Sequence, residues 1–388
     1  MVDPVPNGGF SLVIVFVVDV YNDLKNGTTI TAHRFVEALR ERGHEVRVLA
    51  LGEPGEDNYY VKEAYYGFIS KIGYSQGLTF AKFDEATTRR ALEGADIVHF
   101  LLPLPFEMHV RKVAEKMGVP CSAAFHMQPE NVSHILHFEK AGIEKGIYKL
   151  LHKMFYRHFK HIHCPSTFIA GELKRHGYES KLYVISNGVD KGFVPMDLPE
   201  KVTDPEKFNI LMTGRLSPEK RQEVLIKAVK LSKYEDRIQI YFAGSGPCKQ
   251  RLVKQGQSLT NPPIIDFYYQ PDLVKLINSC DLYVHTATVE IEAIACLEAI
   301  ACGVVPVICN SPTSATVQFA QSDKSLFAAD DPVDLAAKIN YWIEHPAEKL
   351  LLAKKYAAYG DHFRVSASVK KAEFMFREAI EDQKRQAQ

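Results

Sequence analysis

Short apolar runs alternate with helical patterns along the first half of the chain. The first apolar run covers residues 12–18 and ends at Asp19, and a helical pattern follows over residues 32–42. Further apolar or β-branched runs cover residues 45–50, 97–101, 121–125 and 183–185. Helical patterns lie between them at residues 107–117 and 143–159. Strands that alternate with helices in this way predict a parallel sheet covered by helices.

The second half of the chain repeats this alternation. Apolar runs predict strands over residues 208–213, 238–242, 264–268 and 282–285. Helical patterns predict helices over residues 219–231, 248–255 and 271–279. A connector with three prolines and two glycines, residues 187–205, separates the halves. Because 388 residues exceed what one core usually holds, we expect an N-terminal domain over residues 1–190 and a C-terminal domain over residues 191–365.

Composition narrows the class of protein. The 47 basic and 47 acidic residues cancel, which argues against a dedicated nucleic-acid binder. None of the seven cysteines forms a CxxC pair, so we expect reduced thiols in a cytoplasmic protein. No Asp-x-Asp motif and no His/Cys cluster with metal-ligand spacing occurs, so neither a metal nor another cofactor is indicated. The first apolar run has no basic leader and is too short to span a membrane, so we expect a buried strand.

Two glutamates, Glu290 and Glu298, lie at the start of a helix that we expect over residues 293–301. Gly303 suits the left-handed end of this helix, and an apolar strand is expected over residues 304–308. With a helical rise of roughly 1.5 Å per residue, the two carboxylates lie at most about 12 Å apart. That span suits the sugar and the ribose of one nucleotide sugar, with the diphosphate at the helix N-terminus. The alternative is that both glutamates are ordinary solvated helix residues.

A second motif follows a predicted buried strand and opens a helix. Ser217 is expected to cap this helix, with Pro218 at its first position. Arg215 and Lys220 flank the helix start, where an arginine can chelate a diphosphate and a lysine adds a point charge. The alternative is that both are surface cations without a ligand.

These motifs occur together with others along most of the chain. They comprise residues 42–46, 186–190, 214–216 with Lys220, 242–247, and Glu290 with Glu298 and residues 299–308. In this combination the chain resembles the retaining glycosyltransferases of family 4, including those of the diacylglycerol or glycolipid glucosyltransferase type. The resemblance implies the GT-B fold, an α/β architecture of two facing Rossmann-like domains with parallel sheets and an interdomain cleft. It also implies an acceptor-side N-terminal domain, a nucleotide-sugar-binding C-terminal domain, and a last helix near residues 366–388 that packs back on the first domain.

The resemblance also assigns roles to individual residues. Arg215 and Lys220 would neutralise the donor pyrophosphate, and Glu298 would accept hydrogen bonds from the ribose hydroxyls. Glu290 would act in catalysis by holding the donor sugar near its C3 and C4 hydroxyls. The implied reaction needs no metal and retains the configuration at the anomeric carbon.

The chain departs from the family directly after the first glutamate. The family often has Gly-Phe-Gly there, so that backbone N–H groups approach the donor closely. This chain has Ile291, Glu292 and Ala293 instead. We place all three in the donor site, where the extra carboxylate of Glu292 is a candidate to take over part of the role of Glu290.

Other candidates lie in loops at strand ends. His126 ends a predicted strand of the first domain; a lone histidine there is more often structural, but the resemblance implies a catalytic contact with the donor sugar. Gly27, Gly214 and Gly244 lie in turns where a glycine lets the backbone approach an anion, although an ordinary turn is the alternative. Tyr269 is a candidate to pack on the nucleobase, and structural packing explains it equally well.

The acceptor is the least defined part of the prediction. Residues 149–163 carry four cations, no acid and several large apolar residues, which fits a helix on an anionic membrane surface. The alternative is a packing helix with a solvated basic face, whose apolar stripe belongs to the core and comprises Leu150, Leu151, Met154, Phe155 and Phe159. We expect a hexosyltransferase that uses a UDP-sugar and a lipid or glycolipid acceptor, located peripherally on the inner face of the cell membrane. Alternatives are transfer to a soluble sugar or polysaccharide precursor, a nucleotide-binding oxidoreductase, and a non-catalytic nucleotide-sugar binder.

Overall fold

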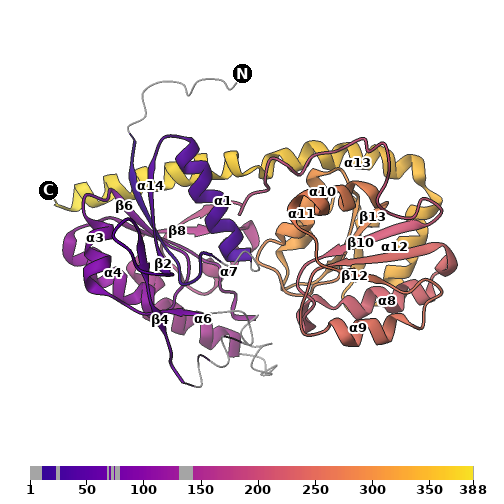
Figure 1. Cartoon of the computed structure of the whole chain (residues 1–388), viewed down its shortest axis with the longest axis horizontal. Coiled ribbons are helices and arrows are strands. Elements are labelled where there is room, and N and C mark those ends of the chain that lie inside the picture. Colours follow the sequence, from indigo (N-terminus) through magenta and orange to yellow (C-terminus); the bar gives the residue numbers. More distant parts are fainter. Residues whose placement is uncertain are drawn as a thin grey trace. The chain divides into compact units, whose positions relative to one another are not determined.

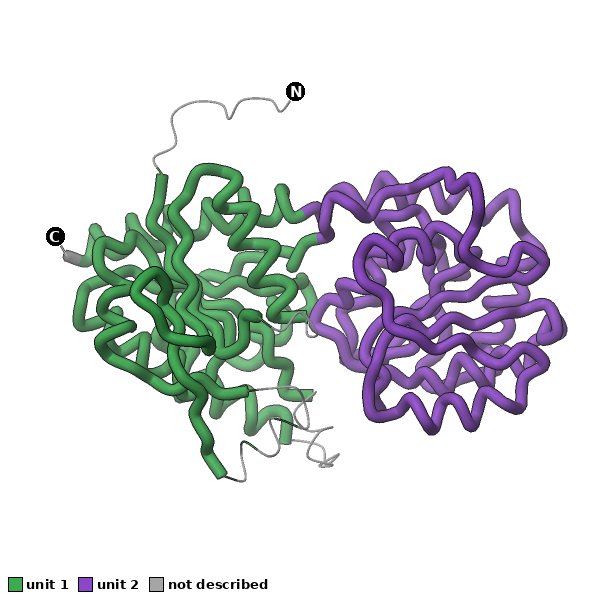
Figure 2. The backbone as a smooth tube through the Cα atoms, in the orientation of Figure 1, with its two compact units in different colours: residues 1–188, 365–388 green, residues 189–364 purple. Residues whose placement is uncertain are grey.

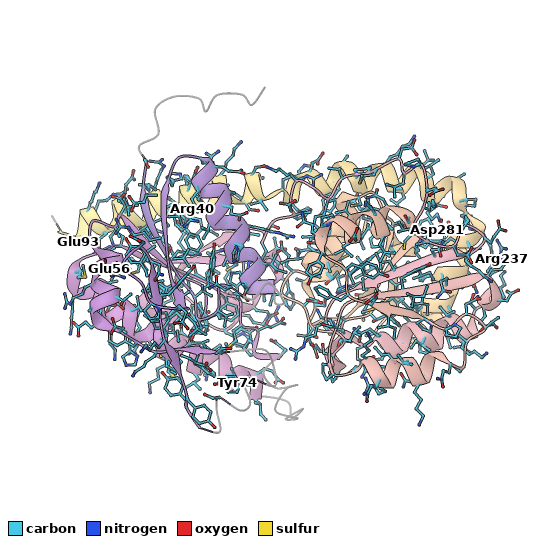
Figure 3. The ribbon with its side chains drawn as sticks, in the orientation of Figure 1. Arg40, Glu56, Tyr74, Glu93, Arg237 and Asp281 are labelled. Carbon is cyan, nitrogen blue, oxygen red and sulfur yellow. The ribbon has the colours of Figure 1, made fainter. Side chains whose placement is uncertain are left out.

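The chain divides into two compact units (Figure 2). Unit 1 comprises residues 1–188 and 365–388, and unit 2 comprises residues 189–364. The structure, a computed structural model, describes residues 11–22, 27–67, 70, 74, 79–130 and 143–387 (Figure 1). In each unit, side chains fill the space between a sheet and the helices that cover it (Figure 3).

The sheet of unit 1 has the strand order β3-β2-β1-β6-β7-β8-β9 among the described residues. All of its neighbouring strands are parallel. The strands are β1 (Val13–Val17), β2 (Glu45–Leu51), β3 (Tyr59–Val61), β6 (Ile97–Phe100), β7 (Cys121–Ala124), β8 (His161–Cys164) and β9 (Lys181–Val184). A short antiparallel pair, β4 (Glu63–Ala64) and β5 (Phe80–Ala81), forms a separate two-stranded sheet. The sequence therefore predicted β1, β2, β6, β7 and β9, whereas β8 lies in a segment that was interpreted as part of a basic helix, because its histidines interrupt the apolar pattern.

The helices of unit 1 begin and end where local sequence signals place them. They are α1 (Gly27–Glu41), α3 (Glu85–Leu92), α4 (Pro105–Met117), α6 (Ile143–Met154), α7 (Thr167–Arg175) and α14 (Val365–Ala387). Ser166 caps α7 by accepting a hydrogen bond from the backbone N–H of Ile169 at 3.2 Å. Gly118 ends α4 in the left-handed conformation at φ 71°, which a glycine adopts without strain. The helix expected over residues 143–159 is shorter than predicted, because a 3-10 turn at Tyr156–His158 follows α6.

The last helix, α14, belongs to unit 1 although it follows unit 2 in the chain. Its apolar face joins one core with β1, β2 and α1 through Val369, Ala372, Met375, Phe376 and Ala379. Polar contacts fix its register on the sheet: Glu373 pairs with Arg42 and His44, and Glu378 accepts a hydrogen bond from Tyr183 at 2.7 Å. The helix therefore supplies both core residues and ion pairs to unit 1.

The sheet of unit 2 has the strand order β12-β11-β10-β13-β14-β15, again with parallel neighbours. The strands are β10 (Phe208–Thr213), β11 (Ile238–Ala243), β12 (Ile264–Asp266), β13 (Leu282–His285), β14 (Pro306–Asn310) and β15 (Leu326–Ala328). The covering helices are α8 (Gln222–Leu231), α9 (Lys249–Gly256), α10 (Gln270–Ser279), α11 (Ile294–Ala301), α12 (Pro332–Glu344) and α13 (Pro346–Gly360). Numbered within the unit, this is the strand order 3-2-1-4-5-6 of a Rossmann fold.

The strand order defines where each sheet can bind a ligand. In unit 2 the chain runs outward from β10 to β12 on one side and from β13 to β15 on the other. In unit 1 the same reversal lies between β1 and β6. Open parallel sheets bind ligands beyond the carboxyl ends of the strands at this switch point. The segments after β10 and β13 are therefore the first place to look for a site in unit 2.

Candidate active site

The loop after β10 is packed directly against the loop after β11. The N–H of Gly214 donates to the carbonyl of Ala243 at 3.0 Å, and the N–H of Leu216 donates to the carbonyl of Ser245 at 2.9 Å. A Cβ atom on Gly244 would lie 1.9 Å from the carbonyl oxygen of Gly214. Gly244 is therefore required for the close approach of two backbones, and this packing fixes the loop that carries Arg215.

The segment after Arg215 differs from the prediction. A 3-10 turn, Pro218–Lys220, comes first, Arg221 then adopts a left-handed conformation at φ 55°, and α8 begins only at Gln222. Ser217 stands at the N-cap position with Pro218 first, as predicted, but it precedes the 3-10 turn, and its hydroxyl donates to the carboxylate of Glu219 instead of capping a backbone N–H. A helical start at residue 219 fails because a residue with positive φ interrupts the turn.

The 3-10 turn is fastened to the segment that follows β13. The Thr286 hydroxyl donates to the carbonyl of Lys220 at 2.7 Å. The N–H of Thr288 donates to the carbonyl of Glu219 at 3.4 Å. These contacts bring the ammonium group of Lys220 to the loop that carries Glu290.

Glu290 is a buried carboxylate with a cation and a histidine as partners. Lys220 forms an ion pair with its Oε1 atom, and the Nε2 atom of His285 lies 3.1 Å from the same oxygen. Burial opposes ionisation, but the charge of Lys220 and the hydrogen bond from His285 outweigh it and lower the pKa of Glu290 to about 2. The backbone is held as well, because the N–H of Ala315 donates to the carbonyl of Glu290 at 2.9 Å. Glu290 is therefore a fixed anion at the switch point of unit 2.

The three residues after Glu290 form a strained entry into α11. Ala293 has φ 68° and ψ 68°, a left-handed conformation that costs a residue with a Cβ about 1–2 kcal/mol. Glu292 is buried beside it, whereas Ile291 is half-buried. The helix begins at Ile294, one residue later than expected. The position where the family often has a glycine is thus a site of backbone strain in this chain.

Glu298 lies in the second turn of α11 and is buried. Burial raises the pKa of Tyr283, and the nearby thiol of Cys296 and the charges of Glu290 and Glu298 raise it further. Both carboxylates thus lie close enough to Tyr283 to raise its pKa. The structure brings Glu290, Glu298 and Lys220 to one edge of the sheet of unit 2, with Arg215 in the adjoining loop.

Tyr269 lies further along the same edge of the sheet. It directly precedes α10, after the end of β12, and 76% of its surface is exposed. Its ring contacts only the edge of Phe267 among the ring contacts of the described residues, at a centroid distance of 5.3 Å. The side chain is an exposed aromatic surface two strands away from β10.

His126 belongs to a group of three buried histidines in unit 1. His99 on β6, His126 after β7 and His163 on β8 lie on neighbouring strands, with His163 5.4 Å from His126 and 5.9 Å from His99 between ring centroids. Burial, with a smaller contribution from His163, lowers the pKa of His126 to about 3. His126 is therefore neutral near pH 7 and acts there as a hydrogen-bonding group. Its Nε2 atom has no hydrogen-bond partner among the described residues.

Gly27 is the first residue of α1, and its carbonyl accepts a hydrogen bond from the Thr31 hydroxyl at 2.7 Å. Residues 23–26, which complete the predicted anion-binding turn, lie outside the described residues. The structure therefore places Gly27 at the start of a helix after β1.

Sequence reasoning missed two groups of buried polar side chains. One is the pair Tyr283 and His285 on β13, which lies in an apolar run and ends directly before the glutamate loop. The other is the buried carboxyl pair Asp19 and Glu107 at the switch point of unit 1, whose two groups influence each other's pKa. Burial raises the pKa of Asp19 to about 6 and that of Glu107 well above its ordinary value. The sequence did offer a signal for two of these residues, because His285 and Asp19 are the polar residues that end the apolar runs of β13 and β1.

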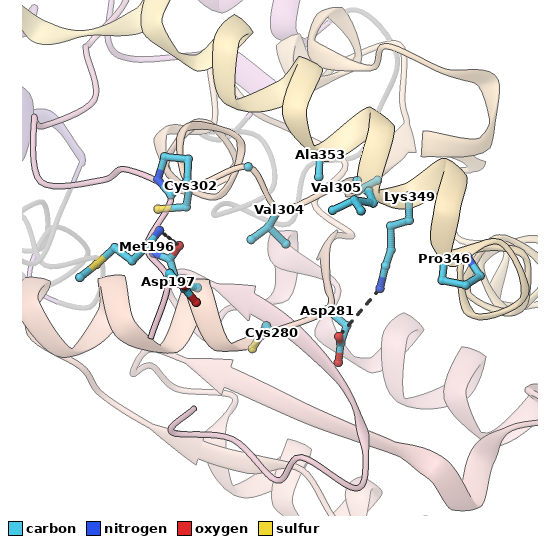
Figure 4. A pocket seen from close by; sticks show the side chains of 14 residues that line it. Met196, Asp197, Cys280, Asp281, Cys302, Val304, Val305, Pro346, Lys349 and Ala353 are labelled. Atoms are coloured by element: carbon cyan, nitrogen blue, oxygen red, sulfur yellow. Dashed lines mark hydrogen bonds and ion pairs between the residues drawn. The ribbon is translucent and has the colours of Figure 1, made fainter. Parts of the chain in front are cut away.

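A cavity of about 640 Å³ lies at the opposite end of the sheet of unit 2 (Figure 4). It is bounded by the amino ends of β13 and β14 and by α13, and Lys349 approaches Asp281 there at 3.9 Å. Because parallel sheets bind ligands at the carboxyl ends of their strands, this cavity is not the donor site. Within the described ranges no group of three or more His, Cys, Asp or Glu side chains could hold a metal ion. None of the described helices is both long and apolar enough to cross a membrane.

Comparison with known sequences identifies the family. Residues 25–193 match the family described as Glycosyltransferase Family 4, and residues 197–361 match the family described as Glycosyl transferases group 1. Over 320 residues the chain is 22% identical to an alpha-monoglucosyldiacylglycerol synthase of Streptococcus pneumoniae, a match that covers 75% of this chain and 69% of the relative. The two family matches together cover most of the chain, which therefore belongs to the glycosyltransferases of family 4. The chain is accordingly an enzyme of the hexosyltransferase type.

Solved structures show the same architecture. Anabaena Alr3699/HepE in complex with UDP and glucose superposes with a TM-score of 0.71 at 16% identity, covering 95% of this chain and 100% of that one. The catalytic domain of cholesterol-alpha-glucosyltransferase from Helicobacter pylori is 44% identical over 40% of this chain and 99% of that one, with a TM-score of 0.38. The likeness to Alr3699/HepE and the two parallel sheets confirm the predicted fold class, GT-B with two Rossmann-like units.

Proposed function

We propose that the protein transfers a hexose from a UDP-sugar to a lipid or glycolipid acceptor, with retention at the anomeric carbon and without a metal ion. The observation that carries this proposal is the buried Glu290 carboxylate. It is kept ionised by Lys220 and His285 at the switch point of a Rossmann-like unit. A fixed anion suits the hydroxyls of a sugar, and the cations beside it suit a diphosphate.

The donor half of the proposal follows from the charges at this edge of the sheet. Arg215 and Lys220 provide the positive charge for the two phosphates, and Glu298 on α11 provides a carboxylate for the ribose. Cations that stabilise the departing diphosphate do the work for which other enzymes use a metal ion, and removal of one such group typically costs about 100- to 1000-fold in rate. Alr3699/HepE, which has the same fold, is described in complexes with UDP-glucose and with UDP and glucose.

The acceptor half of the proposal rests on α6 and on a relative. The helix exposes two apolar side chains one turn apart, Leu150 at 53% and Met154 at 48% of their surface, next to the exposed cations Lys149 and Lys153. The alternative of a packing helix fails for Leu150 and Met154, whereas Phe155 and Phe159 are buried as that alternative expects and Leu151 is half-buried. Exposed apolar and basic residues together fit a surface of anionic lipid. The Streptococcus pneumoniae relative is named a synthase of a glycosyldiacylglycerol.

A donor and acceptor panel tests the proposal. The full-length protein is incubated with UDP-, GDP- and ADP-hexoses, with either diacylglycerol in vesicles or soluble oligosaccharides, and products are identified by mass spectrometry. We expect a glycosylated lipid from a UDP-hexose, with the donor configuration retained and with activity unchanged by EDTA. Turnover of only soluble acceptors would overturn the lipid acceptor, and a requirement for a divalent ion would overturn the metal-independent reaction.

A further inference from the structure

A buried chain of hydrogen bonds runs from the end of β10 to Glu290. The Thr213 hydroxyl lies 3.4 Å from the hydroxyl of Tyr283, which lies 3.2 Å from Nδ1 of His285. The Nε2 atom of His285 lies 3.1 Å from Oε1 of Glu290. Thr213, Tyr283 and His285 are at most 5% exposed, so water does not compete for these contacts.

The Glu290 carboxylate ends this series of hydrogen bonds, and its charge determines which atom donates in each of them. The Glu290 carboxylate is ionised and can only accept, so the Nε2 atom of His285 donates to it. With that N–H on Nε2, the Nδ1 atom of His285 is positioned to accept from the hydroxyl of Tyr283. Burial raises the pKa of Tyr283 well above its ordinary value, so this hydroxyl keeps its proton. The Tyr283 oxygen in turn accepts from Thr213.

These hydrogen bonds matter because Lys220 cannot neutralise both Glu290 and a diphosphate equally well. In this structure the ammonium group of Lys220 is paired with Glu290. If Lys220 neutralises a donor diphosphate, the carboxylate gives up part of its ion pair with this cation. Burial then favours protonation of Glu290, and a protonated carboxyl binds sugar hydroxyls with the wrong polarity. The hydrogen bond from His285 counteracts this, because it lowers the pKa of Glu290.

We propose that His285 is a positioning residue that, through Tyr283 and Thr213, holds Oε1 of Glu290 and presents the other carboxylate oxygen to the donor sugar. This inference rests on the proposed role of Glu290 in donor binding. It assigns a function to three side chains that lie in two apolar strands. Because Thr213 directly precedes Gly214 and Arg215, the same chain ties the sugar-binding carboxylate to the loop that carries the phosphate-binding arginine.

The variants His285→Leu, His285→Gln and Tyr283→Phe test the proposal in the full-length enzyme. Loss of one hydrogen bond to a charged group is worth about tenfold, so we expect His285→Leu to lower kcat/KM for the UDP-sugar by about that factor or more. His285→Gln keeps an N–H donor near the same place and is expected to recover part of the loss. The affinity for UDP, which lacks the transferred hexose, is expected to stay unchanged in all three variants. Tyr356→Phe, which removes the hydroxyl of another buried tyrosine of unit 2, is the matched control.

The pH profile separates positioning from a general loss of structure. Without the histidine N–H the pKa of Glu290 rises, so the acid limb of kcat/KM moves to higher pH in His285→Leu but not in Tyr356→Phe. In a Glu290→Gln background the His285→Leu substitution is expected to have little further effect. If Glu290→Gln is impaired but His285→Leu is fully active, the positioning role of His285 is wrong while the role of Glu290 stands. Full activity of Glu290→Gln would instead overturn the proposed role of Glu290.

Discussion

Lys220 and Glu290, seventy residues apart in the chain, form an ion pair at the carboxyl edge of the sheet of unit 2. The side chain of Glu290 is 11% exposed and that of Lys220 is 21% exposed. Removal of one partner therefore leaves the other charge poorly solvated. This ion pair links the motif of Arg215 and Lys220 to the motif of Glu290 and Glu298, which the sequence analysis identified separately.

Lys220→Met is expected to lower both stability and turnover. The variant leaves the Glu290 carboxylate without its cation, at a cost of about 1–3 kcal/mol in the free energy of unfolding. It also removes a phosphate-binding charge, so kcat is expected to fall by about 100-fold or more. Urea unfolding and initial rates measure the two effects. The double variant with Glu290→Gln is expected to recover stability but not turnover; recovery of turnover would contradict the phosphate role.

Ala293→Gly is expected to stabilise the protein. Ala293 holds a left-handed conformation, and a glycine adopts it without the steric cost of a Cβ, so the gain is up to about 1 kcal/mol. The midpoint of urea unfolding measures it. Ala358→Gly, at an exposed position inside α13, is the matched control and is expected to lose about 1 kcal/mol. Equal losses in both variants would show that the strain at Ala293 is not relieved.

The buried histidines of unit 1 are expected to make the protein sensitive to acid. His126 and His163 have pKa values lowered to about 3 and about 4, chiefly by burial, against 6.5 for an unperturbed histidine. Below pH 6.5 the unfolded chain therefore binds more protons than the folded one, and stability falls as the pH decreases towards these values. Each group contributes about 1.4 kcal/mol per pH unit within its window. Urea unfolding at pH 5 and pH 7 measures the slope, which His163→Gln is expected to reduce; an unchanged slope would contradict it.

Glu107→Gln is expected to stabilise unit 1 at neutral pH. The folded pKa of Glu107 and Asp19 is raised, so their contribution to stability is full at low pH and is lost as the pH rises through the folded pKa. An amide at position 107 removes one of the two acids and can donate to Asp19. Unfolding at pH 7 is expected to require more urea than in the wild type. Glu85→Gln, on the exposed face of α3, is the control without an expected gain.

Charge reversal on α6 and on the 3-10 turn that follows it tests the proposed contact with a membrane surface. Lys153→Glu with Arg157→Glu is expected to abolish sedimentation with vesicles that contain anionic lipid, because each basic residue near such a surface is worth about 1 kcal/mol. Lys354→Glu with Lys355→Glu, at exposed positions of α13, makes the same change in charge on unit 2 and is expected to have no effect. Equal loss in both double variants would show that only net charge matters.

The alternation of apolar runs and helices was enough to predict two parallel sheets, because buried strands such as β1 and β10 are continuous apolar segments. Helix starts were less predictable: Ser217 and Pro218 are typical of an N-cap, but contacts from Thr286 and Thr288 hold the segment as a 3-10 turn. The role of His285 was also hidden. Its partners are Tyr283, two residues earlier on β13, and Glu290 in the following loop, and an apolar run does not reveal hydrogen bonds between them.

The position of α14 constrains how the protein is made. Phe376, Met375 and their neighbours complete the core of unit 1, yet they are synthesised after all of unit 2. On the ribosome, the first unit to emerge therefore cannot close its core until α14 is translated, whereas unit 2 is contiguous and can fold before it. A chain that stops before Val365 would contain a complete unit 2 and a unit 1 with an exposed apolar face.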